Sequence, residues 1–180
     1  MSGGSGADTG RSPLPTGWRR FLFRLPIQLY RTGLGRLLGQ RFLLLEHIGR
    51  TTGQPRRVVL EVVTRDDPCG PSWTVASGFG PDAAWYRNLR AAPHVTVQVG
   101  ARRHAVVARF LPPEDGAEVM ARYAVRHPRL AKQLCAFMGL EVREASVQEF
   151  RRVGRAIPFV RLEVTGQDPP RNGKAGRRPS

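Results

Sequence analysis

The stretch from Gly49 to Arg57 combines residue types that bind anions. Its two glycines can take left-handed backbone conformations and its proline fixes the exit from a turn, so successive N–H groups can converge on one phosphate. Its arginines present forked guanidinium groups, which match phosphate and carboxylate oxygens better than lysine does. We predict a site for a polyanionic ligand here, although the same composition also suits a plain polar hairpin turn. The candidate contacts are Arg50, Thr51, Thr52, Gln54, Arg56 and Arg57.

A second group of motifs follows this turn. Val75-Ala76-Ser77 precedes a glycine-rich loop, and Trp85-Tyr86-Arg87-Asn88-Leu89 belongs to a short helix that ends before Pro93. Together with the turn, these motifs resemble those of the deazaflavin-dependent nitroreductase family, whose members bind coenzyme F-420 on a split β-barrel. The resemblance covers roughly residues 18–164, nearly the whole globular part of the chain.

The resemblance implies an oxidoreductase that transfers a hydride from reduced coenzyme F-420 to a small organic acceptor: a nitro compound, a quinone or a conjugated enone. It implies that the turn holds the phosphate and glutamate tail of the coenzyme, while Val58 and Leu60 line the edge of the deazaflavin ring. The ring would lie against the loop after the third strand and accept backbone hydrogen bonds there. The loop residues are Ala76, Ser77, Gly78 and Phe79. Trp85, Tyr86 and Asn88 would close the pocket around the ribityl arm, and the two aromatic residues also suit the core of a short helix.

The candidates for a proton donor come from a different segment. Tyr123 and His127 lie four residues apart, which places them on one face of a predicted helix. The best-studied branch of the family carries tyrosines around this position, whereas this chain has His127 and Leu130, so the resemblance does not fix the acceptor. The four histidines stand singly, and neither a Ser-His-Asp order nor metal-ligand spacing occurs. We therefore expect no metal, and a cofactor that supplies the chemistry.

The charge of the chain points to an acidic partner. The net charge is +15 over 180 residues, and all but two of the 29 basic residues are arginine. Because arginine bias also reflects genome composition, we expect no specific nucleic acid on this ground. Two alternatives stay open. One is an FMN-binding oxidoreductase of the same fold, and the other is a non-enzymatic basic protein that binds anionic lipid or nucleic acid through residues 18–41 and the C-terminal tail.

The ends of the chain differ from its middle. Residues 1–16 and 166–180 lack large apolar side chains and are predicted to be disordered tails, the second one basic, around a single domain at 17–165. Trp18–Arg31 has helical apolar spacing beside arginines; we expect it to cover the barrel, with peripheral contact to an anionic inner membrane face as the alternative. No signal peptide or paired cysteine spacing occurs, so we expect a cytoplasmic monomer or homodimer.

The remaining elements are typical of an α+β, mainly β fold. Apolar β-branched segments arrive as hairpins with helices inserted between them, which favours an antiparallel sheet closed on itself. We predict a six-stranded antiparallel split β-barrel of the FMN-binding type with flanking helices. The predicted strands are Phe42–Ile48, Arg56–Thr64, Ser72–Ala76, Val95–Val99, Arg102–Phe110 and Ile157–Val164. The predicted helices start near Asp82 as an N-cap, at Pro113, at Leu130 with Gly139 as its C-cap, and at Val147.

Overall fold

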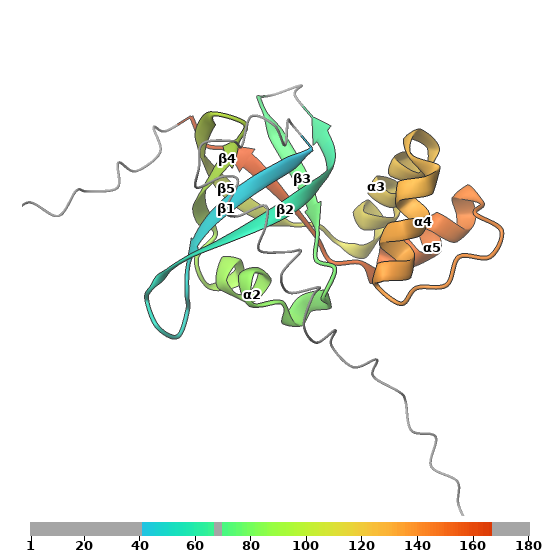
Figure 1. Ribbon diagram of the computed structural model, residues 1–180, viewed down its shortest axis with the longest axis horizontal. Helices are drawn as coiled ribbons and strands as arrows, with labels where there is room; N and C mark the ends of the chain where they lie inside the picture. Colours follow the sequence, from blue (N-terminus) through green and yellow to red (C-terminus); the bar gives the residue numbers. More distant parts are fainter. Residues whose placement is uncertain (1–40, 67–69, 167–180) are drawn as a thin grey trace, which may run out of the picture.

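The structure, a computed structural model, describes residues 41–66 and 70–166 of the chain. The predicted tail at 1–16 and the predicted helix at Trp18–Arg31 lie outside these residues. Six antiparallel strands form a closed barrel in the order β1-β2-β3-β6-β5-β4 (Figure 1), which confirms the predicted fold. The strands are β1 (Phe42–Ile48), β2 (Pro55–Asp66), β3 (Ser72–Ala76), β4 (His94–Val99), β5 (Arg102–Phe110) and β6 (Phe159–Val164).

The described helices all enter at one end of the barrel. Because neighbouring strands are antiparallel, β1, β3 and β5 end where β2, β4 and β6 begin. A 3-10 helix, η2 (Gly80–Asp82), and α2 (Ala84–Ala91) connect β3 to β4. The helices α3 (Pro113–Arg126), α4 (Pro128–Phe137) and α5 (Val147–Ala156) connect β5 to β6. Both connections therefore adjoin the turn between β1 and β2, and Figure 1 shows α2 against this end and α3–α5 to one side.

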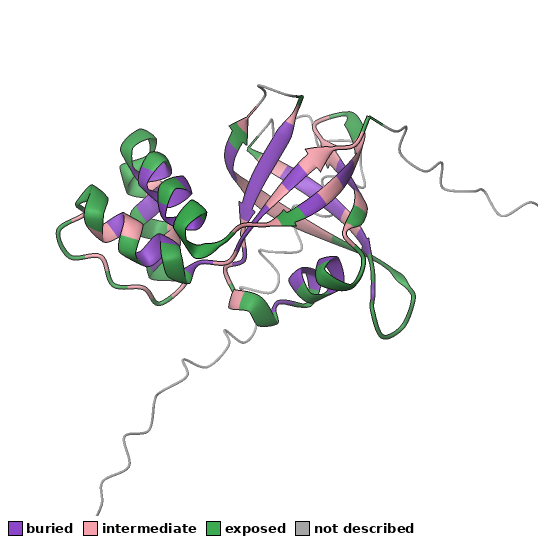
Figure 2. Ribbon diagram, turned by 180° about the vertical axis from the view of Figure 1, so that it is seen from behind, coloured by how far each residue is buried: buried purple, intermediate pink, exposed green. Residues whose placement is uncertain are grey.

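Alternate strand residues fill the barrel, as strand geometry requires. Leu43 and Leu45 of β1 and Val75 of β3 are fully buried in its interior. The barrel core also includes side chains of α2, so this helix closes the core at one end. The α2 residues in this core are Trp85, Tyr86 and Leu89. Figure 2 shows buried residues both in the barrel strands and in α2 at the end of the barrel.

The helices α3, α4 and α5 enclose a second core of their own. A β-bulge between Val62 and Thr64 disturbs the register of β2, and Val63 joins this second core together with Phe159 of β6. The crossing of α3 and α5 is close, because a Cβ on Gly154 would lie 2.7 Å from the carbonyl oxygen of Gly116. The helical layer is thus packed tightly and is joined to the barrel wall through β2 and β6.

Gly139 ends α4 as predicted, in the position directly after the C-cap residue Met138. Gly139 has φ +71, its N–H donates to the Ala136 carbonyl at 3.1 Å, and the Leu140 N–H donates to the Cys135 carbonyl at 2.9 Å. This pair of bonds is the Schellman arrangement that ends many helices at a glycine.

Several element boundaries differ from their predictions: β2 extends to Asp66 and α4 begins at Pro128, and the starts of α2 and β6 also differ. Asp82 is not the N-cap of α2, because the chain first forms η2, and Ala83 occupies the cap position without a side-chain bond. Asp82 pairs instead with Arg87, at 2.9 Å. The last strand begins at Phe159, later than the predicted Ile157, because α5 continues to Ala156 and Ile157 packs into the helical core.

Candidate functional site

The turn between β1 and β2 is held together by its own backbone. The Gly49 N–H donates to the Gln54 carbonyl at 2.9 Å, and the Gly53 N–H donates to the Gly49 carbonyl at 2.8 Å. Gly53 has φ +64, a left-handed conformation that favours glycine. The Gln54 N–H donates to the Thr52 hydroxyl oxygen at 3.4 Å. The N–H groups of Gly49, Gly53 and Gln54 therefore close the turn, and donation of backbone N–H groups to a ligand stays a prediction for Thr51 and Thr52.

The turn offers its exposed side chains to a ligand instead. Arg50, Thr51, Thr52, Gln54 and Arg56 are all exposed. Among the described residues, neither Arg50 nor Arg56 pairs with a carboxylate, whereas Arg57 pairs with Glu46 at 2.8 Å. A guanidinium without a carboxylate keeps its donors and its charge available to an external anion. The structure thus leaves Arg50 and Arg56 available for an anionic ligand, whereas Arg57 is paired with Glu46 of β1.

Helix α2 fastens this turn through one buried amide. The Asn88 side chain is 5 % exposed, and its Oδ1 accepts from the Arg50 backbone N–H at 3.1 Å and from Arg50 Nη1 at 3.3 Å. Its Nδ2 lies 3.0 Å from Nδ1 of His47, a buried residue of β1. The structure therefore brings the predicted residues Asn88 and Arg50 together, through atoms of Asn88 that are already used inside the protein.

His47 is the residue of this cluster that the sequence prediction missed. Burial lowers the pKa of His47 from its usual value, and the charge of Arg56 lowers it further, against a hydrogen bond with the Ile48 backbone that raises it. The one signal in the sequence is its position: His47 continues the inward alternation of Leu43 and Leu45 toward the end of β1.

The loop after β3 lies at the same end of the barrel. Ser77 is fully buried, its N–H donates to the Pro158 carbonyl at 2.8 Å, and its hydroxyl donates to the Gly80 carbonyl at 2.6 Å. The predicted donation from the Ser77 backbone to a ligand is therefore corrected, because this N–H extends the pairing of β3 and β6. Ala76 pairs with Phe159 in the same ladder. The N–H of Gly78 has no hydrogen-bond partner in the described part of the chain.

Two aromatic rings surround Gly78. Phe79 and Phe137 are 52 % and 41 % exposed, and their ring centroids lie 5.5 Å apart in an edge-to-face arrangement. A Cβ on Gly78 would lie 2.8 Å from Cε1 of Phe137, so glycine allows this ring of α4 to rest on the loop backbone. The predicted residues Gly78 and Phe79 thus belong to an apolar wall between the barrel loop and α4.

Other predicted ligand contacts are packed inside the barrel. Trp85 and Tyr86 are 8 % and 7 % exposed, with ring centroids 5.8 Å apart, and the Tyr86 ring also meets Phe110 edge to face at 5.0 Å. Val58 and Leu60 are half-buried against the same core. These side chains support the site from within, and contact with a ligand stays a prediction for all four of the predicted residues.

Tyr123 and His127 lie on the helical side of the molecule. Their ring centroids are 5.5 Å apart; Tyr123 is 4 % exposed in the second core, and His127 is exposed at the junction of α3 and α4. Burial raises the pKa of Tyr123 to about 12, with Glu61 raising it further and Arg41 lowering it. The hydroxyl is therefore protonated near neutral pH, so Tyr123 can donate a hydrogen bond but is a weak acid.

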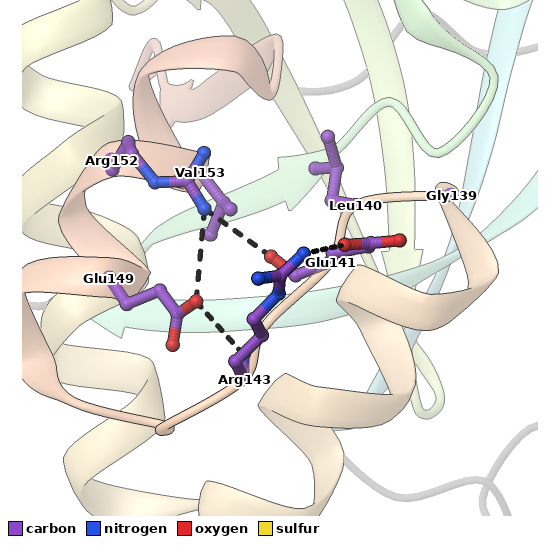
Figure 3. Close-up of a pocket in the computed structure, with 7 residues that line it drawn as sticks. All are labelled: Gly139, Leu140, Glu141, Arg143, Glu149, Arg152 and Val153. Carbon is purple, nitrogen blue, oxygen red and sulfur yellow. Dashed lines mark hydrogen bonds and ion pairs between the residues drawn. The ribbon is translucent and has the colours of Figure 1, made fainter.

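A cavity of about 420 Å³ lies between the end of α4 and α5 (Figure 3). Its charged groups are paired with each other: Arg143 with Glu141 at 3.3 Å, and Arg152 with Glu149 at 3.8 Å. The Glu149 carboxylate also accepts backbone N–H bonds, first that of Arg143 at 2.9 Å, which hold its pKa below its usual value. We interpret this cluster as the closure of the loop between α4 and α5, because its charges are satisfied internally.

Within the described residues, cysteine and metal-ligand side chains do not form a second reactive site. Burial raises the pKa of the Cys135 thiol to about 11, so it stays protonated and is a poor nucleophile. Within residues 41–66 and 70–166, no three or more His, Cys, Asp or Glu side chains are grouped so that they could hold a metal ion. Over the same residues, no helix combines the length and the apolar composition that crossing a membrane requires.

Comparison with known sequences shows which family the chain resembles. The sequence model of the family described as F420H(2)-dependent quinone reductase matches residues 22–134, which include the turn, the loop after β3, α2 and α3. The F420H(2)-dependent quinone reductases Rv1261c and MT1299 of Mycobacterium tuberculosis are 36 % identical over 103 residues. The alignment covers 52 % of this chain and 66 % of each relative, so the chain spans slightly less than two thirds of their length.

Similarity to solved structures is lower. The structure titled F420-H2 dependent reductase (FDR-A) is 22 % identical, with a TM-score of 0.47, over 69 % of this chain and 96 % of that one. A conserved hypothetical protein of Mycobacterium tuberculosis, Rv2991, is 16 % identical with a TM-score of 0.48, over 76 % of this chain and 79 % of that one. The barrel assignment rests on the strand order of the chain itself.

Proposed function

The chain belongs to the F420H(2)-dependent quinone reductase family, and from this premise we propose that it is an oxidoreductase that uses reduced coenzyme F-420 to reduce a quinone. One observation carries the proposal. The turn at the helical end of the barrel exposes two guanidinium groups, those of Arg50 and Arg56, which pair with no carboxylate among the described residues. The anionic tail of the coenzyme is the ligand that these groups suit best.

The donors of the turn fit that tail. A phosphate and several glutamate carboxylates need more than one cation, and the turn supplies two arginines together with the exposed hydroxyls of Thr51 and Thr52. FMN, which carries one terminal phosphate, would leave part of this donor set unused. The charge of the turn is also fixed in place, because Asn88 holds Arg50 through both its backbone and its side chain.

The coenzyme and the protein have different roles in the proposed reaction. When bound, reduced coenzyme F-420 supplies a hydride to the acceptor. The turn would bind the tail, and Phe79 would exclude water from the ring. The N–H of Gly78, which has no partner within the described residues, would orient the ring. Tyr123 and His127 are our weak candidates for the proton donor that completes the reduction of a quinone to a hydroquinone. The raised pKa of Tyr123 suits a hydrogen bond to the acceptor better than release of its proton, and His127 lies beside it at the surface.

A quinone is the acceptor that the relatives' names and the apolar wall together favour. The two M. tuberculosis relatives are named as quinone reductases. In this chain, the rings of Phe79 and Phe137 stand edge to face beside Gly78, and aromatic faces and edges suit a flat ring. Nitro compounds and conjugated enones, which the sequence resemblance also implied, are the competing acceptors in the test.

Turnover with a matched pair of arginine variants tests the proposal. We expect anaerobic oxidation of reduced coenzyme F-420 by a soluble quinone, followed by absorbance, to be faster than with a nitroarene or an enone. Arg56→Ala should weaken coenzyme binding by about 1 to 3 kcal/mol, because it removes a charge-assisted contact. Arg57→Ala should cost less than about 1 kcal/mol, because Arg57 already pairs with Glu46.

Equal losses in the two variants would contradict a specific tail site, since each removes one positive charge from the same strand. Turnover with reduced FMN but not with reduced coenzyme F-420 would overturn the cofactor assignment.

A further inference from the structure

His47, Asn88 and Arg50 form a chain of hydrogen bonds that links the barrel interior to the turn. His47 comes from β1, Asn88 from α2 and Arg50 from the turn, so three segments meet at one amide. Two of the three side chains, those of His47 and Asn88, are 7 % and 5 % exposed, while Arg50 reaches the surface. These hydrogen bonds therefore connect the buried imidazole of His47 to the exposed guanidinium of Arg50.

The direction of each hydrogen bond in this chain is determined. Both groups that meet Asn88 Oδ1, the Arg50 backbone N–H and Arg50 Nη1, are donors without lone pairs to offer. The oxygen of the amide must therefore face Arg50, and the amide nitrogen must face His47. Because Nδ2 can only donate, Nδ1 of His47 must accept, which requires a neutral imidazole with its proton on Nε2.

We infer that His47 is a positioning residue for the coenzyme: in its neutral form it holds the Asn88 amide in the orientation that fixes the Arg50 guanidinium for the anionic tail. The inference rests on the proposed function, because it takes the turn as the tail site. It goes further in assigning a role to a residue that does not touch the ligand, and in making tail binding depend on the protonation of that residue.

Protonation of His47 would break its hydrogen bond with the Asn88 amide. A proton on Nδ1 would oppose the Nδ2 donor of Asn88, and the amide could keep a bond to His47 only by rotating its oxygen away from Arg50. The charged groups that face His47 are Arg56 on the paired strand and Arg50 on the turn, both cationic. Glu46, the nearest acid along the strand, pairs with Arg57 and Arg103. Among these groups, only the hydrogen bond with the Ile48 backbone favours the imidazolium, and burial and the charge of Arg56 oppose it.

The direction of the pH effect follows from this environment. Burial is the main cause that lowers the pKa of His47, so the neutral form persists to lower pH than for an exposed histidine. The link to Asn88 is intact above the lowered pKa and is lost as the pH falls through it. Affinity for the tail should therefore fall only below about pH 6.5, the ordinary pKa of histidine.

Coenzyme titrations with three histidine variants test this role. We expect wild-type affinity for coenzyme F-420 to fall about tenfold as the pH is lowered from about 8 through the lowered pKa of His47, the loss of about one good hydrogen bond. His47→Gln, whose amide oxygen can accept from Asn88 without titrating, should bind like wild type at pH 8 and lose this fall. His47→Leu should bind about tenfold more weakly at both pH values. Titration of the coenzyme itself affects its binding to the wild type and to every variant equally, so it cancels when their pH profiles are compared.

His104→Gln is the matched control. His104 is also a half-buried strand histidine whose pKa burial lowers, but it contacts Trp73, with ring centroids 5.0 Å apart, instead of the turn. The control should keep the wild-type pH profile. A profile in His47→Gln that matches wild type and the control would overturn the inference.

A measurement without coenzyme separates this inference from the proposed function. In the apo protein, ¹⁵N NMR of the imidazole should show His47 with its proton on Nε2. Amide exchange at Arg50 should be about tenfold faster in His47→Leu, with no change at Leu44 of the barrel wall. A proton on Nδ1, or equal acceleration at both amides, would contradict the inference even where coenzyme binds. If the wild type binds no coenzyme F-420, the proposed function fails, and the NMR result still decides the role of His47.

Discussion

The two helical insertions of the barrel enter at the same end but are built differently. Helix α2 has no core of its own, because its buried side chains complete the barrel core, while its polar residue Asn88 holds the Arg50 turn. The helices α3–α5 form a separate core around residues such as Met120 and Phe150, with a close glycine crossing. We infer that the tail site shares the rigidity of the barrel, whereas the acceptor side belongs to an independently packed layer.

The family match follows the same division. It covers α2 and α3 completely and ends within α4, so α5 lies beyond it. A separately packed layer can change its sequence with little effect on the barrel core, because among the described residues the two cores meet only at the strands β2, β3 and β6. This arrangement would let the acceptor vary while the cofactor site is kept.

Removing one large side chain from each core should give the largest effects. Leu89→Ala and Phe150→Ala should destabilise the protein by about 2 to 5 and 3 to 5 kcal/mol, because both residues are almost fully buried. Urea unfolding measures these losses. Under native conditions, Leu89→Ala should also weaken binding of coenzyme F-420, since it loosens the helix that carries Asn88, and Phe150→Ala should not. Equal binding losses in the two variants would contradict the division into a cofactor side and an acceptor side.

The barrel was predictable because its signals are local. Alternating apolar strands such as Arg102–Phe110 and the hairpin turn at Gly49 to Gln54 appear in the sequence with nearly the boundaries that the structure shows. The start of α2 was mispredicted because Asp82 looks like an N-cap, while the preceding Gly80 and Pro81 favour a separate 3-10 turn.

The polar details of the site were harder to predict. Whether a turn donates its N–H groups to a ligand or to itself depends on backbone geometry, and the residue types at Gly49 and Gly53 suit both. The role of His47 depends on a contact with Asn88, 41 residues away in the chain. A single sequence carries no signal for such a pairing, apart from the inward position of the histidine.

A smaller stability effect should come from the glycine crossing of the helical layer. Gly154→Ala places a methyl group 2.7 Å from both the Gly116 carbonyl oxygen and Met120 Cβ. The helices must separate slightly, which should cost about 1 to 3 kcal/mol by overpacking. Gln148→Ala, an exposed change on the same helix, serves as the control in thermal unfolding and should change stability by less than about 0.5 kcal/mol. A stabilised Gly154→Ala protein would show that the two helices have room between them.

The smallest expected effect is the loss of the α5 cap. The Ser146 side chain accepts the Glu149 N–H at 3.2 Å, and Ser146→Ala should destabilise the protein by about 1 kcal/mol. Chemical unfolding detects a change of this size, and binding of coenzyme F-420 should stay at its wild-type value because the cap lies in the helical layer. A loss of coenzyme affinity would mean that the two sides of the site are coupled.

A crystal structure of the protein with coenzyme F-420 tests the central claim most directly. The account predicts that the phosphate of the tail lies within hydrogen-bond distance of the Arg50 or Arg56 guanidinium, with the Asn88 amide still holding Arg50. A tail bound elsewhere on the chain, with the turn left in solvent, would contradict it.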